Sequence, residues 1–323
     1  MLDIPPLYTL PFAFFTARGG DTRKVSRDSL DRLIACRVPL IEPKNIVWSE
    51  VQRTVFFAYQ HFQYVYPDAV HNLTQHLIVQ PRRQYAGQRL LDFKLAAEPI
   101  PLAAQQTEDL FGNTVLKLEV AQISHWTSFE VMFCIENQIG QTAAPVSSAE
   151  AGLYLPSTRL TAANNQILEV AKKLQHQSSS SAEFAERVAD WISQTMQYKN
   201  GVTNVQTTAA QALEIGSGLC QDYSHIMLAI CRAVGLPARY VSGHMLGEGS
   251  SHAWCEVLLE QGQVIAFDPT NARQPNLGYT VVAIGRDYTD VPPTSGAFIG
   301  GQAGQLHFEK YAGLLEVEHK TKS

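Results

Sequence analysis

The first half of the chain carries short runs of β-branched and aromatic residues with little helical periodicity. Turn-forming sequences such as Tyr66-Pro67-Asp68 and Phe111-Gly112-Asn113 separate these runs. Strands of this length and spacing predict an antiparallel β-sandwich over residues 49–147. The runs cover residues 54–59, 62–66, 76–79, 90–95, 114–120 and 128–135. Residues 1–48 hold several prolines and a short helical start at residues 28–34, so we predict an N-terminal extension of unknown role.

The second half changes to the spacing of amphipathic helices. Ile167, Val170, Ala171 and Leu174 recur at i, i+3, i+4 and i+7, which predicts a helix over residues 164–174. Further helices are expected over residues 182–196, 208–213 and 220–234, and strands over 239–245, 252–259 and 264–267. Helices followed by consecutive strands indicate an α+β domain rather than a doubly wound sheet. We assign residues 148–323 to it.

Composition narrows the class of protein. Hydrophobic residues make up 45% of the 323 residues, enough to bury a sizeable core. A net charge of −5 does not indicate the positively charged surface that binds nucleic acid or an anionic membrane. No apolar stretch is long enough to span a membrane, and the N-terminus lacks the basic region of a secretory signal. Five widely spread cysteines do not resemble a disulfide framework, so we expect a reduced, cytoplasmic protein.

One of these cysteines is a candidate nucleophile. Cys220 follows Gly216-Ser217-Gly218-Leu219 and opens the predicted helix over residues 220–234. The positive end of the helix dipole favours a thiolate, and the free N–H groups there can donate to an oxyanion. The glycines permit a tight turn and close approach of a substrate to the backbone, which makes Gly218 a candidate substrate-binding residue.

A histidine and an aspartate on neighbouring strands are its candidate partners. His252 begins one predicted strand, and Asp268 ends the next. Their separation of 16 residues is even, so a hairpin with a three-residue loop at Glu260-Gln261-Gly262 puts both side chains on one face. An aspartate beside a histidine fixes its tautomer and stabilises the imidazolium, which can exchange a proton with the thiol and the leaving amine.

Ordered motifs in both halves resemble the bacterial transglutaminase-like family, whose members are often described as cysteine proteases. The resemblance spans about residues 50–300. In the second half it rests on residues 218–225, 235–243, 252–254, 267–270 and 285–293. In the first half it rests on Gln80-Pro81-Arg82, residues 109–113 and Ser124-His125.

The resemblance implies a papain-like, transglutaminase-type α+β core after the sandwich domain. It also implies that Cys220 is the nucleophile, His252 the base and Asp268 its orienting partner. Cys255 departs from the residue that many relatives carry, and we expect it in the core, facing away from His252.

For several neighbouring residues the sequence gives weaker evidence of a role in the site. Trp254 shares the face of His252 and is a candidate substrate-binding residue or a core aromatic. Asp222 is expected to cap its helix, and His225 and His244 to be structural. Arg286, Asp287 and Asp290 are expected to form structural ion pairs. Gln206, Gln211, Gln221 and Tyr198 are all able to supply a second oxyanion donor beside the Cys220 N–H, and the sequence does not choose among them.

We therefore predict a cysteine enzyme that forms a thioester on a peptide or protein amide, with hydrolysis favoured over transfer to an amine. A non-catalytic peptide-binding scaffold is the alternative class. A zinc site of Cys220, His252 and Asp268, with His244, lacks CxxC or HExxH spacing, so we predict no metal and no cofactor. We expect no nucleic-acid or membrane partner, and leave a homo-oligomer open.

Overall fold

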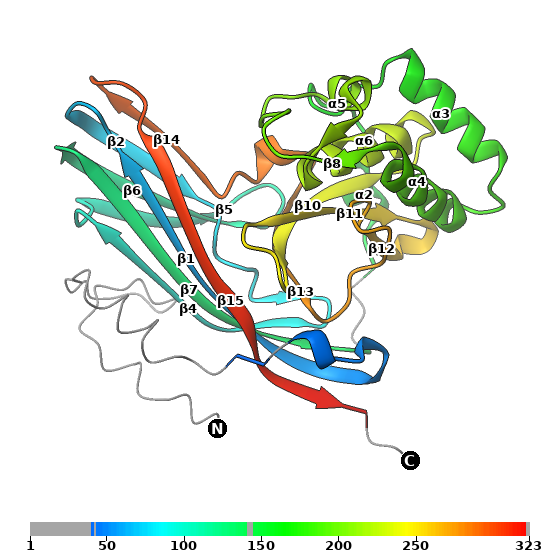
Figure 1. Cartoon of the computed structure of the whole chain (residues 1–323), viewed down its shortest axis with the longest axis horizontal. Coiled ribbons are helices and arrows are strands. Elements are labelled where there is room, and N and C mark those ends of the chain that lie inside the picture. Colours follow the sequence, from blue (N-terminus) through cyan, green and yellow to red (C-terminus); the bar gives the residue numbers. More distant parts are fainter. Residues whose placement is uncertain (1–39, 42, 141–144, 321–323) are drawn as a thin grey trace. The chain divides into compact units, whose positions relative to one another are not determined.

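The computed structural model describes residues 40–41, 43–140 and 145–320, in which the chain forms two compact units. The first unit holds the described residues up to 84 together with residues 88–139 and 293–320. The second holds Tyr85–Gly87 and the described residues between 140 and 292. The helices labelled in Figure 1 all belong to the second unit. The helical start predicted at residues 28–34, and Cys36, lie outside the described residues.

The first unit is built from two antiparallel sheets, as the sequence predicts. Their strand orders are β15-β1-β7-β4-β3 and β14-β2-β6-β5. The strands are β1 (Val51–Val65), β2 (Val70–Leu77), β3 (Gln84–Tyr85), β4 (Gln88–Glu98), β5 (Ala103–Glu108), β6 (Thr114–Ile123), β7 (Trp126–Gln138), β14 (Thr294–Ile299) and β15 (Gln305–His319). Short 3-10 turns at Pro43–Asn45 and Trp48–Glu50 precede β1.

Strand alternation places the core of this unit. Phe129, Val131, Phe133 and Ile135 of β7 are every second residue, and each is fully buried. The runs predicted at residues 54–59 and 62–66 are one strand, β1, because Gln60-His61 between them supplies no turn residue. A hydrogen bond between the hydroxyls of Tyr64 and Thr294 links the two sheets.

The C-terminal segment corrects the predicted domain boundary. We assigned residues 148–323 to one α+β domain, but β14 and β15 pair with β2 and β1 of the first unit. The β15 register runs from Val65 opposite Gln305 to Val51 opposite His319. Alternating residues predict a strand but not its partner, and this partner lies about 250 residues away along the chain.

The second unit is α+β, as predicted. Its main sheet is antiparallel with the order β12-β11-β10-β13, and a short parallel pair joins β8 to β9. The strands are β8 (Gln197–Tyr198), β9 (Ser217–Gly218), β10 (Ala238–Met245), β11 (His252–Leu258), β12 (Val264–Phe267) and β13 (Tyr279–Gly285). The helices are α2 (Ser148–Leu153), α3 (Asn165–His176), α4 (Ser181–Thr195), α5 (Ala209–Ile215) and α6 (Cys220–Ala233).

Local sequence explains where these helices begin. The side chains of Asn164, Ser180 and Thr208 accept the N3 backbone N–H of α3, α4 and α5. Helix α6 is the centre of the unit, because it contacts α3, α4, α5, β10 and β11. Among the described residues, no helix combines the length and hydropathy needed to cross a membrane.

Candidate active site

Cys220 is the first residue of α6, at the end of the turn that follows β9. Leu219 before it has an extended backbone with φ −108° and ψ 177°, so the helix starts abruptly at the thiol. The Cys220 residue is half-buried, in contrast to the interior of the helix that follows it. A thiol in this position meets the free backbone N–H groups and the positive end of the helix dipole.

Asp222 holds this turn in place. Its Oδ2 accepts the backbone N–H of Leu219 at 2.8 Å and the hydroxyl of Thr203 at 2.7 Å, so it caps the helix as predicted. Burial raises the pKa of Asp222 although these hydrogen bonds oppose the shift. A Cβ at position 218 would lie 2.4 Å from this Oδ2, so Gly218 leaves the space that the carboxylate fills.

His252 and Asp268 meet on one face of the sheet. His252 Nε2 lies 2.8 Å from Asp268 Oδ2, and both side chains are buried. The β11–β12 register pairs Cys255 with Phe267 and Leu258 with Val264. The Leu259 N–H then binds the Gln263 carbonyl at 2.7 Å, which leaves Glu260–Gly262 as the three-residue loop. This is the parity that the even spacing of the two residues predicts.

The Asp268 carboxylate is saturated with donors. Oδ1 accepts the backbone N–H groups of Thr270 at 3.0 Å and Asn271 at 3.2 Å. Oδ2 accepts Asn271 Nδ2 and the Tyr279 hydroxyl, both at 2.8 Å, besides the imidazole. Burial alone would raise the pKa of Asp268, but the hydrogen bond and the charge of His252 and the other donors lower it.

The imidazole joins the thiol to this carboxylate. Burial alone would lower the pKa of His252, but hydrogen bonds with Asp268 and with Cys220, and the negative charge of both partners, raise it to about 9. Since Nε2 is taken by Asp268, Nδ1 is the atom left to face the thiol. The structure therefore brings Cys220, His252 and Asp268 together from three separate elements.

Two aromatic side chains fix the imidazole plane. The His252 ring stacks on Trp254 at a centroid distance of 6.2 Å and meets Tyr279 edge-on at 5.9 Å. Trp254 is 1% exposed, so it is a buried support for the histidine in this structure. A Cβ at position 243, opposite His252, would lie 2.6 Å from the Trp254 ring, so Gly243 makes room for the indole.

The other three thiols within the described residues lie in the core. Cys255 faces away from His252, as predicted, and its Sγ contacts the Ser224 carbonyl oxygen of α6 at 3.3 Å. Burial raises the pKa of Cys255 well above its usual range, and raises that of Cys231 and of Cys134 to about 12. These three thiols are therefore protonated and shielded from solvent.

The two histidines expected to be structural are both buried. His225 Nε2 accepts the Tyr288 backbone N–H at 3.2 Å, and burial lowers its pKa to about 4, so it is neutral at pH 7. The predicted ion pair forms between Arg286 Nη2 and Asp290 Oδ1 at 2.8 Å. Asp287 instead accepts the Thr289 backbone N–H at 2.7 Å.

The four candidate oxyanion donors differ in their hydrogen-bond partners and exposure. Gln211 completes a capping box with Thr208, and Gln206 binds Arg159. Gln221 Nε2 is buried without a hydrogen-bond partner. Tyr198 lies opposite Gly218 in the β8–β9 pair, is 53% exposed, and interacts electrostatically with Cys220 and Asp268. Partial burial of its hydroxyl and the nearby negative charges raise the pKa of Tyr198 to about 12, so the hydroxyl stays a donor.

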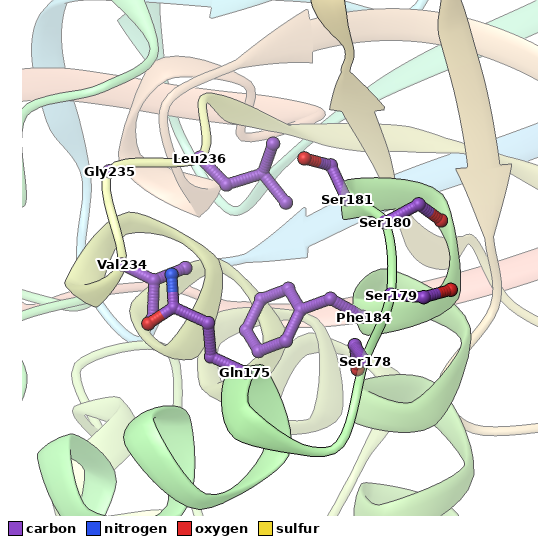
Figure 2. A pocket seen from close by; sticks show the side chains of 9 residues that line it. All are labelled: Gln175, Ser178, Ser179, Ser180, Ser181, Phe184, Val234, Gly235 and Leu236. Carbon is purple, nitrogen blue, oxygen red and sulfur yellow. The ribbon is translucent and has the colours of Figure 1, made fainter.

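A cavity of about 250 Å³ lies elsewhere in the second unit (Figure 2). Its wall is made by the serines between α3 and α4 on one side and by the end of α6 on the other. The lining residues are Gln175, Ser178–Ser181, Phe184, Val234, Gly235 and Leu236, so the cavity does not include Cys220, His252 or Asp268. Within the described part of the chain, no cluster of three or more histidine, cysteine or acidic residues is arranged to hold a metal ion.

Comparison with known proteins assigns the class that this geometry suggests. Residues 168–269 match the transglutaminase-like superfamily, and residues 59–136 match the bacterial transglutaminase-like N-terminal region. The chain thus has a transglutaminase-like core and a bacterial transglutaminase-like N-terminal region. The fold is that of a crystal structure described as a "Putative Cysteine Protease from Cytophaga hutchinsonii", with a TM-score of 0.70 and 22% identity over 84% of this chain and 94% of that one.

Two mycobacterial relatives are more similar in sequence over shorter stretches. An uncharacterized Mycobacterium leprae protein, ML0607, is 34% identical over 164 residues, which are 47% of this chain and 57% of that protein. The uncharacterized Mycobacterium tuberculosis protein Rv2569c is 37% identical over 114 residues, 31% of this chain and 36% of that protein. The matches therefore span between about a third and just over half of these relatives.

Proposed function

We propose that this protein is a cysteine enzyme that cleaves a peptide or protein amide through a thioester on Cys220. The observation that carries the proposal is the interaction of His252 with two partners, one of which, Cys220, acts on its pKa. One is the Cys220 thiol at the start of α6, and the other is the Asp268 carboxylate at 2.8 Å. Nucleophile, base and orienting acid in this order are the parts that acyl transfer requires.

The first half of the reaction uses the imidazolium. The Cys220 thiolate attacks the amide carbonyl, and a C–S bond forms as the carbonyl π electrons move to oxygen. The tetrahedral intermediate collapses when His252 gives its proton to the nitrogen, so that the C–N bond breaks and the amine leaves. A pKa of about 9 keeps His252 protonated near neutral pH, ready for this step.

Two donors are proposed for the oxyanion. The backbone N–H of Cys220 is one, because the first N–H groups of a helix have no intrahelical partner. The Tyr198 hydroxyl is the other, since Tyr198 is exposed and interacts electrostatically with Cys220. Gln206 and Gln211 are engaged elsewhere, which supports this choice.

The second half transfers the acyl group to water. Neutral His252 takes a proton from water, the oxygen attacks the thioester, and the acid leaves as the C–S bond breaks and the thiolate re-forms. We favour hydrolysis over transfer to an amine because the sequence carries no motif that points to a dedicated amine site. Cys220 is half-exposed, so a peptide or protein chain can reach its thiol.

Alkylation tests the activated nucleophile. Brief iodoacetamide treatment at pH 7, followed by peptide mass spectrometry, reports the rate at each cysteine in one sample. We expect Cys220 to react many times faster than a free thiol, while Cys134, Cys231 and Cys255 stay unlabelled and serve as internal controls. A Cys220 rate equal to that of free cysteine would favour the non-catalytic scaffold.

Product analysis tests the choice of acceptor. A peptide library incubated in ¹⁸O-labelled water with a biotinylated primary amine yields labelled acids by hydrolysis or biotinylated amides by transamidation. We expect ¹⁸O in new carboxyl termini, with Cys220→Ala giving neither product. Biotin incorporation in excess of ¹⁸O would make the protein a transglutaminase instead.

A further inference from the structure

A second cationic side chain, that of Arg273, is linked to the Asp268–His252 pair through Tyr279. Tyr279, at the start of β13, donates its hydroxyl hydrogen to Asp268 Oδ2 at 2.8 Å. The same hydroxyl oxygen accepts Arg273 Nε–H at 2.9 Å, and the guanidinium lies over the Tyr279 ring, 5.4 Å from its centroid. The arginine thus reaches the carboxylate through the phenol.

The loop after β12 holds Arg273 in this place. Asp268 and Arg273 form an isolated antiparallel bridge, with the Asp268 N–H bound to the Arg273 carbonyl at 2.8 Å and the reverse bond at 3.3 Å. The loop folds back between them with Ala272 in the left-handed region at φ 47°. The backbone of Asp268 therefore fixes the residue whose side chain acts on its own carboxylate.

The hydrogens that each side chain can donate fix the direction of the hydrogen bonds from Arg273 through Tyr279 to Asp268. A guanidinium can only donate, so the Tyr279 oxygen accepts from Arg273 and its single proton must go to Asp268. Burial and the negative charge of Asp268 raise the pKa of Tyr279 far above its usual value, so that proton stays in place. A donor that is itself hydrogen-bonded to a cation is stronger, because the bonds polarise one another.

We propose that Tyr279 is a positioning residue that, with Arg273, sets the strength of the Asp268–His252 hydrogen bond and thereby the proton affinity of the imidazole. The inference deepens the proposed function and rests on it. Tyr279 competes with His252 for the same oxygen, Oδ2, and draws charge away from it. Its ring also meets the imidazole edge-on at 5.9 Å, so the same side chain acts on the charge of Asp268 and, together with Trp254, on the plane of the base.

Side chains from several elements act on the charge of His252, some of them directly and others through a neighbour. They are Cys220 from α6, Asp268 after β12 and Tyr279 from β13, with Arg273 behind the phenol. Tyr198 of β8 interacts with Cys220 and Asp268. Without the phenol, the carboxylate charge is more concentrated on the oxygen that faces the imidazolium, so the His252 pKa is expected to rise further.

The experiment is an NMR titration of the full chain with ¹⁵N-labelled histidine. The chain has ten histidines, and His252→Gln identifies the resonance of interest. We expect Tyr279→Phe to raise the His252 pKa by roughly half a unit, the effect of one hydrogen bond. Arg273→Gln, at an exposed residue, is expected to shift it in the same direction with the fold intact.

The double variant gives the sharpest result. If Arg273 acts through the phenol, adding Arg273→Gln to Tyr279→Phe moves the His252 pKa little further, so the two effects are not additive. Tyr154→Phe is the matched control, because Tyr154 is a buried tyrosine that also contacts an arginine, Arg239, at 5.6 Å. It is expected to leave the His252 titration unchanged.

Each outcome bears on one proposal only. An unchanged His252 pKa in folded Tyr279→Phe, or additive shifts in the double variant, would overturn the role of Tyr279. Slow iodoacetamide labelling of Cys220 in the unaltered protein would overturn the proposed enzyme, whatever the titration shows.

Discussion

The His252 imidazole and the Asp268 carboxylate occupy diagonal positions of one β-hairpin and share a hydrogen bond of 2.8 Å. The pair is buried, and the carboxylate accepts four further donors. Asp268 can therefore orient the imidazole without rotating itself. Its environment suits a carboxylate only, since each of these partners offers a hydrogen.

Asp268→Asn is the first prediction. The amide has the shape of the carboxylate, but its NH₂ group must face N–H or O–H donors on one side or the other. We expect the His252 pKa to fall from about 9, thermal stability to drop, and turnover to decrease by roughly 1,000-fold or more. Differential scanning fluorimetry and histidine NMR give the first two effects, and p-nitrophenyl acetate hydrolysis the third. Wild-type turnover in this variant would contradict the assigned role.

The pH dependence of stability follows from the same pair. The His252 pKa is about 9 in the folded chain against 6.5 ordinarily, so the folded state binds the extra proton more tightly. The contribution, roughly 3 kcal/mol, is fully present below pH 6.5 and is lost as the pH rises to 9. Urea unfolding at pH 6 and pH 9.5 measures it. His252→Gln should lose less stability between these two values, and an equal loss in both proteins would refute the linkage.

The parity of the hairpin is the part of the site that sequence reasoning could reach. The even spacing of His252 and Asp268 and the three-residue loop at Glu260–Gly262 are enough to predict the shared face. The capping role of Asp222 and the core position of Cys255 also follow from local spacing. The four helices and three strands predicted after residue 148 lie where the structure has them.

Tyr279 and Arg273 could not be found in this way. Their roles depend on a loop that folds back on Asp268 and on a strand added at the far edge of the sheet, neither of which leaves a periodic signal. The same reason explains the missed pairing of β15 with β1, because strand partners distant in sequence are chosen by tertiary packing. Gly243, opposite His252, is a weak signal: an isolated glycine within a predicted strand indicates close approach, here of Trp254.

Gly218→Ala should disturb the nucleophile through Asp222. The added methyl group would lie 2.4 Å from Asp222 Oδ2, so the carboxylate must leave the Leu219 N–H and the Thr203 hydroxyl. We expect a loss of about 1–3 kcal/mol in unfolding free energy and slower alkylation of Cys220. Gly249→Ala is the matched control, because a methyl group at that position would meet nothing within 4 Å. Equal behaviour of the two variants would show that the turn tolerates a side chain.

Tyr198→Phe isolates the proposed oxyanion donor. The variant keeps the ring, which lies 6.4 Å from the Tyr223 ring, and removes only the hydroxyl. Because the oxyanion forms in acyl transfer but not in alkylation, we expect iodoacetamide labelling of Cys220 to stay at the wild-type rate. Hydrolysis of p-nitrophenyl acetate should fall roughly 100-fold in kcat with little change in KM. Tyr223→Phe, the same change on the neighbouring buried ring, should leave kcat near the wild-type value. A parallel loss of labelling and hydrolysis in Tyr198→Phe would mean that the phenol supports the thiolate rather than the transition state, and full retention of both would assign the second donor to Gln221.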